Sequence, residues 1–200
     1  MLESLTSLIS GSPWTYAIVL GFAAGDALFP FFPSETAAIG AGVLAGSGDL
    51  SIALVIAAAG AGAFIGDNSS YGVGRTAGQR ATGPLFRGEK GRARRRWAER
   101  TLEQRGGYLI VAARFIPGGR TATTLTAGVT RMRWTRFVRF AALAAALWAS
   151  FAAGLGYLGG RAFEEQPFLG LVAAVTVAVT MTLGVEIVRR LPRLRAAPCA

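Results

Sequence analysis

Four charged residues lie beside proline turns in otherwise apolar sequence, and their types and spacing could support chemistry. Asp26 and Glu35 bracket the first turn, whereas Arg114 and Arg120 bracket the second, which has the sequence Pro-Gly-Gly. An unpaired charge in hydrocarbon costs roughly 2.5–3.5 kcal/mol on insertion scales, so charges at such positions indicate a functional site. We expect the acid pair and the arginine pair to face each other.

The two arginines suit the phosphate of an anionic lipid headgroup. A guanidinium group is planar, forms bidentate hydrogen bonds with phosphate oxygens and keeps its charge. Arg114 and Arg120 are placed on opposite arms of one turn, where glycines allow a close approach of the backbone. A short helix beginning near Arg120 would add a favourable dipole for an anion. The sequence therefore predicts that both arginines bind the phosphate of a substrate.

The two acids are predicted to couple this site to protons. Histidine is absent from the chain, so a proton-linked step must use a carboxylate. In the empty protein Asp26 and Glu35 could neutralise the arginines, because buried charges persist when they are paired. A bound phosphate would take over the arginines and favour protonation of the acids. The alternative is a structural ion-pair cluster that holds the two turns together.

Asp67 and Tyr71 form a secondary candidate site. Asp67 is followed by Tyr71 about one helical turn later and by Arg75 two turns later. Such spacing also allows Asp67 to pair along its own helix without any function. The sequence leaves both interpretations open.

The composition is that of a small polytopic membrane protein. Of its 200 residues, 52% are hydrophobic and only 16% are charged, below the quarter that is usual for soluble domains. The single cysteine, Cys199, excludes an intramolecular disulfide and a cysteine metal site, and we expect neither a metal nor another cofactor. Residues 1–12 contain Glu3 and no basic residue, so we expect the first apolar segment to be retained rather than removed as a signal peptide.

The apolar segments predict an all-α fold with two broken and three continuous elements. Prolines divide residues 13–48 into halves shorter than the ~20 residues that cross a bilayer, so a re-entrant helical hairpin is predicted there. Residues 107–129 repeat this pattern around their own turn. Full crossings are predicted at 50–74, 140–160 and 168–188.

An internal repeat with an offset of 86 residues relates the two halves. Ala41-Gly42-Val43 matches Ala127-Gly128-Val129, and Tyr71-x-x-Gly74-Arg75 matches Tyr157-x-x-Gly160-Arg161 in the same register. We therefore divide one membrane domain, 1–200, into repeat 1 at about 13–75, a basic loop at 75–106, repeat 2 at about 107–161 and the C-terminal helix.

The distribution of basic residues orients the chain. Of the 21 Lys and Arg residues, ten lie in 75–106, four in 131–139 and four in 189–195. The positive-inside rule then places loop 75–106 and the C-terminus in the cytoplasm and gives the repeats opposite orientations, as in many secondary transporters. The loop is interpreted as a topology signal that also attracts anionic lipid, not as a nucleic-acid site, because Trp97 is the one aromatic residue within its basic stretch 89–105.

Three other tryptophans and the small residues are assigned to packing. Trp14, Trp134 and Trp148 are predicted to be interface anchors or packing residues rather than ligands. Glycines in 50–74 offer close helix contacts, and small-residue faces on 50–74 and 140–160 would permit a homodimer.

Five motifs are spread along the chain: Pro33-Ser34-Glu35, Ala41-Gly42, Gly66-Asp67-x-x-x-Tyr71-x-x-Gly74-Arg75, Arg114-Phe-Ile-Pro-x-x-Arg120 and Ala127-Gly128-x-x-x-Met132 before Phe137. Together they resemble those of the DedA family, also called the SNARE-associated or VTT-domain family, over about residues 13–190. The resemblance implies a polytopic inner-membrane lipid transporter. Bacterial members are implicated in returning undecaprenyl phosphate or phospholipid across the cytoplasmic membrane, and eukaryotic relatives act as scramblases. The family's functional acids and arginines map onto Asp26, Glu35, Arg114 and Arg120, although many members have Glu where this chain has Asp26.

We therefore predict a proton-linked, flippase-type transporter of a phosphate-bearing lipid, with undecaprenyl phosphate as the leading candidate, in the bacterial cytoplasmic membrane. Its partners are membrane lipids and protons. An energy-independent phospholipid scramblase or phosphatidylethanolamine translocase is the alternative. An intramembrane enzyme is not expected, because the sequence offers no histidine and no nucleophile paired with a base.

Overall fold

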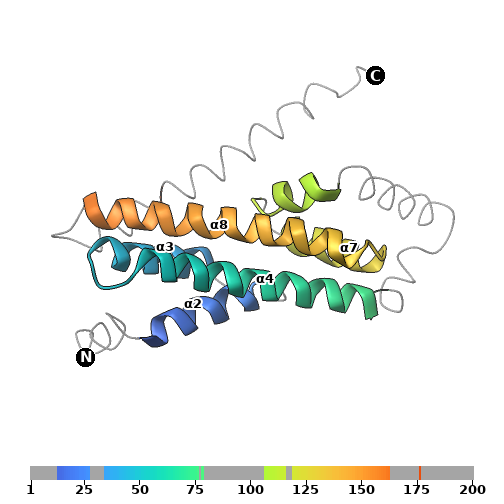
Figure 1. Cartoon of the computed structure of the whole chain (residues 1–200), viewed down its shortest axis with the longest axis horizontal. Helices are drawn as coiled ribbons and strands as arrows, with labels where there is room; N and C mark the ends of the chain where they lie inside the picture. The colour runs from blue at the N-terminus through green and yellow to red at the C-terminus, as the bar shows by residue number, and fades with distance from the viewer. Residues whose placement is uncertain are drawn as a thin grey trace, which may run out of the picture.

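The fold is all-helical throughout the part of the chain that the structure describes (Figure 1). It is a computed structural model and describes residues 13–27, 34–76, 78, 106–115, 119–162 and 176. Residues 106–113 are also helical and form a short arm before the second turn. The named helices are α2 (Pro13–Gly25), α3 (Ser34–Gly46), α4 (Ile52–Thr76), α7 (Gly119–Val129) and α8 (Trp134–Ala162).

The short helices agree with the predicted break in each apolar segment. Helices α2 and α3 have 13 residues each and α7 has 11, so each is shorter than the ~20 residues that cross a bilayer. Both turns, at 28–33 and 116–118, lie outside the described residues. Re-entry of these arms into the membrane therefore stays a prediction.

The long helices α4 and α8 are the two described helices that are long and apolar enough to cross a membrane. They correspond to the predicted crossings 50–74 and 140–160. Helix α8 begins at Trp134, earlier than predicted, because Phe137 is fully buried against Tyr71 and extends the helix back through the basic run. Of the predicted crossing 168–188, the structure describes Thr176 alone, and most of loop 75–106 also lies outside the described residues.

Glycines allow the helices to pack backbone against backbone. A Cβ added at Gly42 would overlap the backbone of Ala153, and one added at Gly156 would overlap the backbone of Ile39. Helices α3 and α8 are therefore joined by small residues on both sides, as expected for association of helices within a membrane. On α4, Gly62 and Gly66 are used in the same way against α2.

The short helix of each half packs on the long helix of the other half. Helix α3 packs on α8, whereas α7 packs on α4. Glycines at equivalent positions of the two repeats make these close contacts. Gly42 on α3 corresponds to Gly128 on α7, and Gly74 on α4 corresponds to Gly160 on α8, each at the repeat offset of 86. Figure 1 shows α4 and α8 side by side along the bundle.

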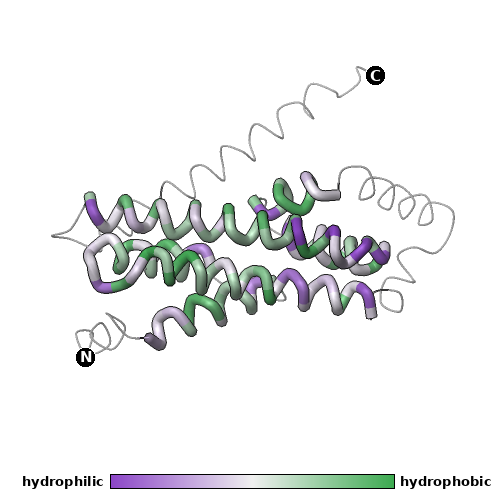
Figure 2. Tube along the Cα trace, viewed as in Figure 1, coloured by the Kyte–Doolittle hydropathy of each residue, from purple (hydrophilic) through white to green (hydrophobic). Residues whose placement is uncertain are grey.

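The contacts also fix the directions of the helices. Gly60 of α4 lies near Ala149 of α8, and Asn68 of α4 accepts a hydrogen bond from the indole of Trp134, so α4 and α8 are antiparallel. Helix α7 runs parallel to α4, and α3 runs parallel to α8. Figure 2 shows hydrophilic residues along α7 and the adjoining end of α4, with more hydrophobic colouring along the rest of α4 and along α2.

Replacing Gly156 by alanine is expected to lower the free energy of unfolding by about 1–3 kcal/mol, because the added methyl overlaps the backbone of α3. Thermal unfolding in detergent measures this change. The matched control is Gly154→Ala, two positions earlier on α8, where an added Cβ meets nothing within 4 Å. Equal melting temperatures for the two variants would contradict the close packing of α3 on α8.

Candidate functional site

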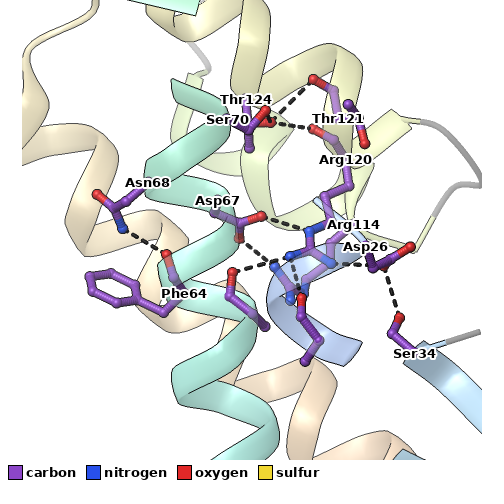
Figure 3. Close-up of polar contacts among 12 residues, drawn as sticks. Asp26, Ser34, Phe64, Asp67, Asn68, Ser70, Arg114, Arg120, Thr121 and Thr124 are labelled. Atoms are coloured by element: carbon purple, nitrogen blue, oxygen red, sulfur yellow. Dashed lines mark hydrogen bonds and ion pairs between the residues drawn. The ribbon is translucent and has the colours of Figure 1, made fainter. Parts of the chain in front are cut away.

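A cluster of two acids and two arginines lies between the helices, with Asp67 at its centre (Figure 3). Asp67 lies on α4, and its side chain is only 2% exposed. Its Oδ2 atom pairs with Nη1 of Arg114 at 2.5 Å, and its Oδ1 atom pairs with Nε of Arg120 at 2.6 Å. One carboxylate therefore holds both arginines.

Arg120 has partners on all three of its nitrogens. Besides the contact of Nε with Asp67, its Nη1 atom pairs with Oδ2 of Asp26 at 2.9 Å. Its Nη2 atom donates to the carbonyl of Ala63 at 3.1 Å and to the carbonyl of Ala23 at 3.4 Å. The side chain thus ties α7 to α2 and α4. Its guanidinium has no free nitrogen for a ligand in this arrangement.

Three hydroxyl contacts fix the surroundings of the cluster. Ser34, the first residue of α3, donates its hydroxyl to Oδ2 of Asp26 at 2.8 Å. The hydroxyls of Ser70 and Thr124 are 2.9 Å apart in a fully buried contact between α4 and α7. Thr124 in turn donates to the carbonyl of Arg120 at 3.0 Å. Helix α7 is therefore held by side chains as well as by glycine packing.

Arg114 differs from Arg120 because half of its guanidinium has no hydrogen-bond partner among the described residues. Its side chain is 2% exposed, and its Nη1 atom pairs with Asp67. The Nε and Nη2 atoms are buried and have no hydrogen-bond partner among the described residues. These two atoms form one edge of the guanidinium plane, the edge that binds two oxygens of a carboxylate or phosphate. Since buried donors are normally paired, this edge is a candidate ligand site.

The formal charges of Asp26, Asp67, Arg114 and Arg120 cancel. Neutrality matters here because charges removed from water are tolerated when they are paired. The predicted meeting of acids with arginines is thus observed for Asp26 and Arg120. The second acid that pairs with the arginines, however, is Asp67.

Glu35 is not brought to the arginines, contrary to the prediction. It is exposed and makes no ion pair with either of them, and the charge that acts on it among the described residues is the like charge of Asp26. The reason is the helical rotation of about 100° per residue. Because Ser34 faces Asp26 at the start of α3, Glu35 is turned away from the cluster.

The sequence does not decide the role of Asp67, because its own helix offers Arg75 as a partner. In the structure Arg75 donates to the hydroxyl of Tyr71 at 2.8 Å instead. The signal that could have identified Asp67 is its position, more than two turns inside a helix of membrane-spanning length. A charge at such a position needs a partner from another segment.

Tyr71 lies outside the charge cluster and contacts the connection between α7 and α8. Its hydroxyl donates to the carbonyl of Met132 at 2.6 Å, and its ring stacks on Phe137 with centroids 4.5 Å apart. This connection contains Arg131 in a left-handed conformation, with φ of 54°. Tyr71 thus holds a turn, and the described contacts give it no place beside the arginines.

The chain belongs to the VTT-domain family, the family of DedA, and is a membrane protein. Residues 32–158 match the VTT domain. Protein DedA of Escherichia coli K12 is 30% identical over 186 residues, which are 88% of this chain and 83% of that protein. An uncharacterised membrane protein of Synechocystis is 35% identical over 149 residues, covering 72% of this chain and 66% of the relative. An uncharacterised membrane protein of Mycobacterium leprae is 29% identical over 185 residues, covering 90% of this chain and 77% of the relative. No solved structure matches the chain.

Proposed function

We propose that the protein is a flippase-type transporter that moves a phosphate-bearing lipid across the bacterial cytoplasmic membrane. The observation that carries the proposal is the buried Nε–Nη2 edge of Arg114, which has no partner among the described residues. Two parallel N–H donors in one plane match two oxygens of a phosphate group. Undecaprenyl phosphate is the leading candidate substrate.

The two arginines take different roles in this proposal. Arg114 binds the phosphate, whereas Arg120 holds α7 against α2 and α4 through Asp67, Asp26 and two backbone carbonyls. An arginine with all its nitrogens occupied must break ion pairs before it can bind a ligand. Arg114 needs no such exchange.

Proton coupling follows from charge balance. The empty cluster is formally neutral, so a bound phosphate brings at least one uncompensated negative charge into a buried site. Protonation of one acid offsets that charge. Asp26 is the acid of the cluster with the more exposed side chain, 21% against 2% for Asp67, and exposed Glu35 lies close enough to interact with it. We propose that the proton reaches Asp26 with the help of Glu35.

The proposed transport route uses two inverted repeats that enter from opposite sides of the membrane, with loop 75–106 and the C-terminus in the cytoplasm. The antiparallel arrangement of α4 and α8 supports opposite orientation of the halves. The packing of α3 on α8 and of α7 on α4 supports the repeat, because glycines 86 residues apart make the equivalent contacts. Binding sites at the meeting point of short broken helices are typical of such transporters.

Reconstitution in liposomes tests the proposal. Labelled undecaprenyl phosphate is expected to cross the membrane faster with the protein than without it, and faster still when a proton gradient is imposed. Labelled phosphatidylethanolamine, tested in parallel, separates the two substrate classes. Flux that ignores the gradient identifies a scramblase instead, and release of inorganic phosphate from the lipid identifies an enzyme. Either result contradicts the proposed transport.

A further inference from the structure

Trp148 is a buried aromatic residue of α8 that touches the charge cluster. It is 5% exposed, whereas Trp14 and Trp134 are 75% and 56% exposed. The central carbon of the Arg114 guanidinium lies over the Trp148 ring, 5.0 Å from its centroid. Tryptophan is the strongest partner for a cation on an aromatic face, and the attraction increases when both groups are shielded from water.

The same face of α8 also contacts Phe115, the residue after Arg114. Phe115 meets Phe151 edge-on, with ring centroids 6.3 Å apart and planes at 81°. Phe151 follows Trp148 by three positions, so both residues lie on the same side of the helix. Consecutive residues of the arm thus contact successive aromatic residues of α8.

We propose that Trp148 is a positioning residue that holds the phosphate-binding edge of Arg114 in place. This inference rests on the proposed function. Asp67 fixes the guanidinium at Nη1, but a contact at one nitrogen still allows the plane to rotate. The Trp148 ring lies against the same guanidinium, whose central carbon is over the ring, and this second contact limits that rotation. Together they leave the Nε–Nη2 edge open in a single orientation.

A fixed edge has a consequence for the ligand. Groups ordered before binding lose less conformational freedom when the ligand arrives. The edge offers two donors, which fit two oxygens of a single phosphate group, and the occupied nitrogens of Arg120 offer no second clamp. Trp148 therefore acts on the affinity for one lipid phosphate, by orienting the arginine rather than by touching the phosphate.

The test compares Trp148→Leu with Trp148→Phe in liposomes containing increasing fractions of undecaprenyl phosphate. The leucine variant is expected to raise the apparent KM about tenfold with little change in maximal flux, because it removes the aromatic face. The phenylalanine variant keeps a face and is expected to restore most of the affinity. The matched control is Phe137→Leu, which alters a buried aromatic residue of the same helix that stacks on Tyr71, and it should leave the apparent KM unchanged.

A second background separates this inference from the proposed function. When Arg114→Ala is already present, Trp148→Leu is expected to cause no further loss of flux, because there is no guanidinium left to orient. Three results would overturn the role of Trp148. They are an equal loss of flux from Trp148→Leu with and without Arg114→Ala, an unchanged apparent KM in Trp148→Leu, and an equal rise in apparent KM in Trp148→Phe and Trp148→Leu. Wild-type flux in Arg114→Ala alone would instead overturn the proposed phosphate site.

Discussion

Replacing Asp67 by alanine is expected to lower the free energy of unfolding by about 3–5 kcal/mol, the range for removing one partner of a buried ion pair. The physical reason is that this carboxylate holds Arg114 and Arg120 at once. Without it Arg114 has lost its one ion-pair partner among the described residues, and the cluster carries a net positive charge. Chemical unfolding in detergent micelles measures the change.

The control for this variant is Asp49→Ala. Asp49 is an exposed acid in the connection between α3 and α4, and about four turns of α4 separate it from Asp67. Its removal is expected to change the free energy of unfolding by no more than about 0.5 kcal/mol, as for most surface substitutions. Similar losses for the two variants would show that Asp67 does not hold the arginines as described.

Replacing Arg114 by lysine is expected to lower lipid flux at subsaturating substrate by about 100-fold. A lysine keeps the charge and can still pair with Asp67, but it lacks the planar pair of donors that the phosphate requires. The loss of two charge-assisted hydrogen bonds, each of about 1.5 kcal/mol, corresponds to this factor. Initial rates of labelled undecaprenyl phosphate transport in proteoliposomes measure it, and the melting temperature should stay near that of the wild type.

Arg120→Lys is the matched control, because the second arginine joins three helices through donors that a lysine cannot all replace. This variant is expected to lose thermal stability, in contrast to Arg114→Lys. If Arg114→Lys unfolded more readily than Arg120→Lys while both transported equally well, the division between a binding arginine and a structural arginine would be wrong.

The helices could be predicted from the sequence because hydrophobic length and proline position determine them locally. The break in residues 13–48 gives two helices of 13 residues, and the long apolar segments give α4 and α8. The start of α8 at Trp134 could not be predicted in this way. It depends on burial of Phe137 against Tyr71, a contact between segments far apart in the chain.

The sequence predicts that acids pair with arginines, but it does not identify every acid that does so. A buried arginine needs an acid, and Asp26 supplies one for Arg120 as expected. Asp67 rather than Glu35 pairs with the arginines, because the face of α3 that meets the cluster carries Ser34. Sequence spacing gives no information on that rotation, because the rotation depends on the helices that pack against α3.

The difference between the two arginines was also beyond the sequence. Arg114 and Arg120 are chemically identical, and both were predicted to bind phosphate. Their different surroundings arise from the carbonyls of Ala23 and Ala63, which accept hydrogen bonds from Arg120, and from the ring of Trp148, which lies against Arg114. Such neighbours are set by the packing of α2, α4 and α8.

Direct binding of a soluble lipid phosphate tests the central claim, that the free edge of Arg114 is the phosphate site. Calorimetric titration of the detergent-solubilised protein with a short-chain phosphatidic acid is the measurement, with the matching diacylglycerol as the control ligand. We expect saturable binding of the phosphatidic acid alone and a loss of about 100-fold in affinity in Arg114→Lys. Equal affinity of the wild type and Arg114→Lys for phosphatidic acid would contradict the account.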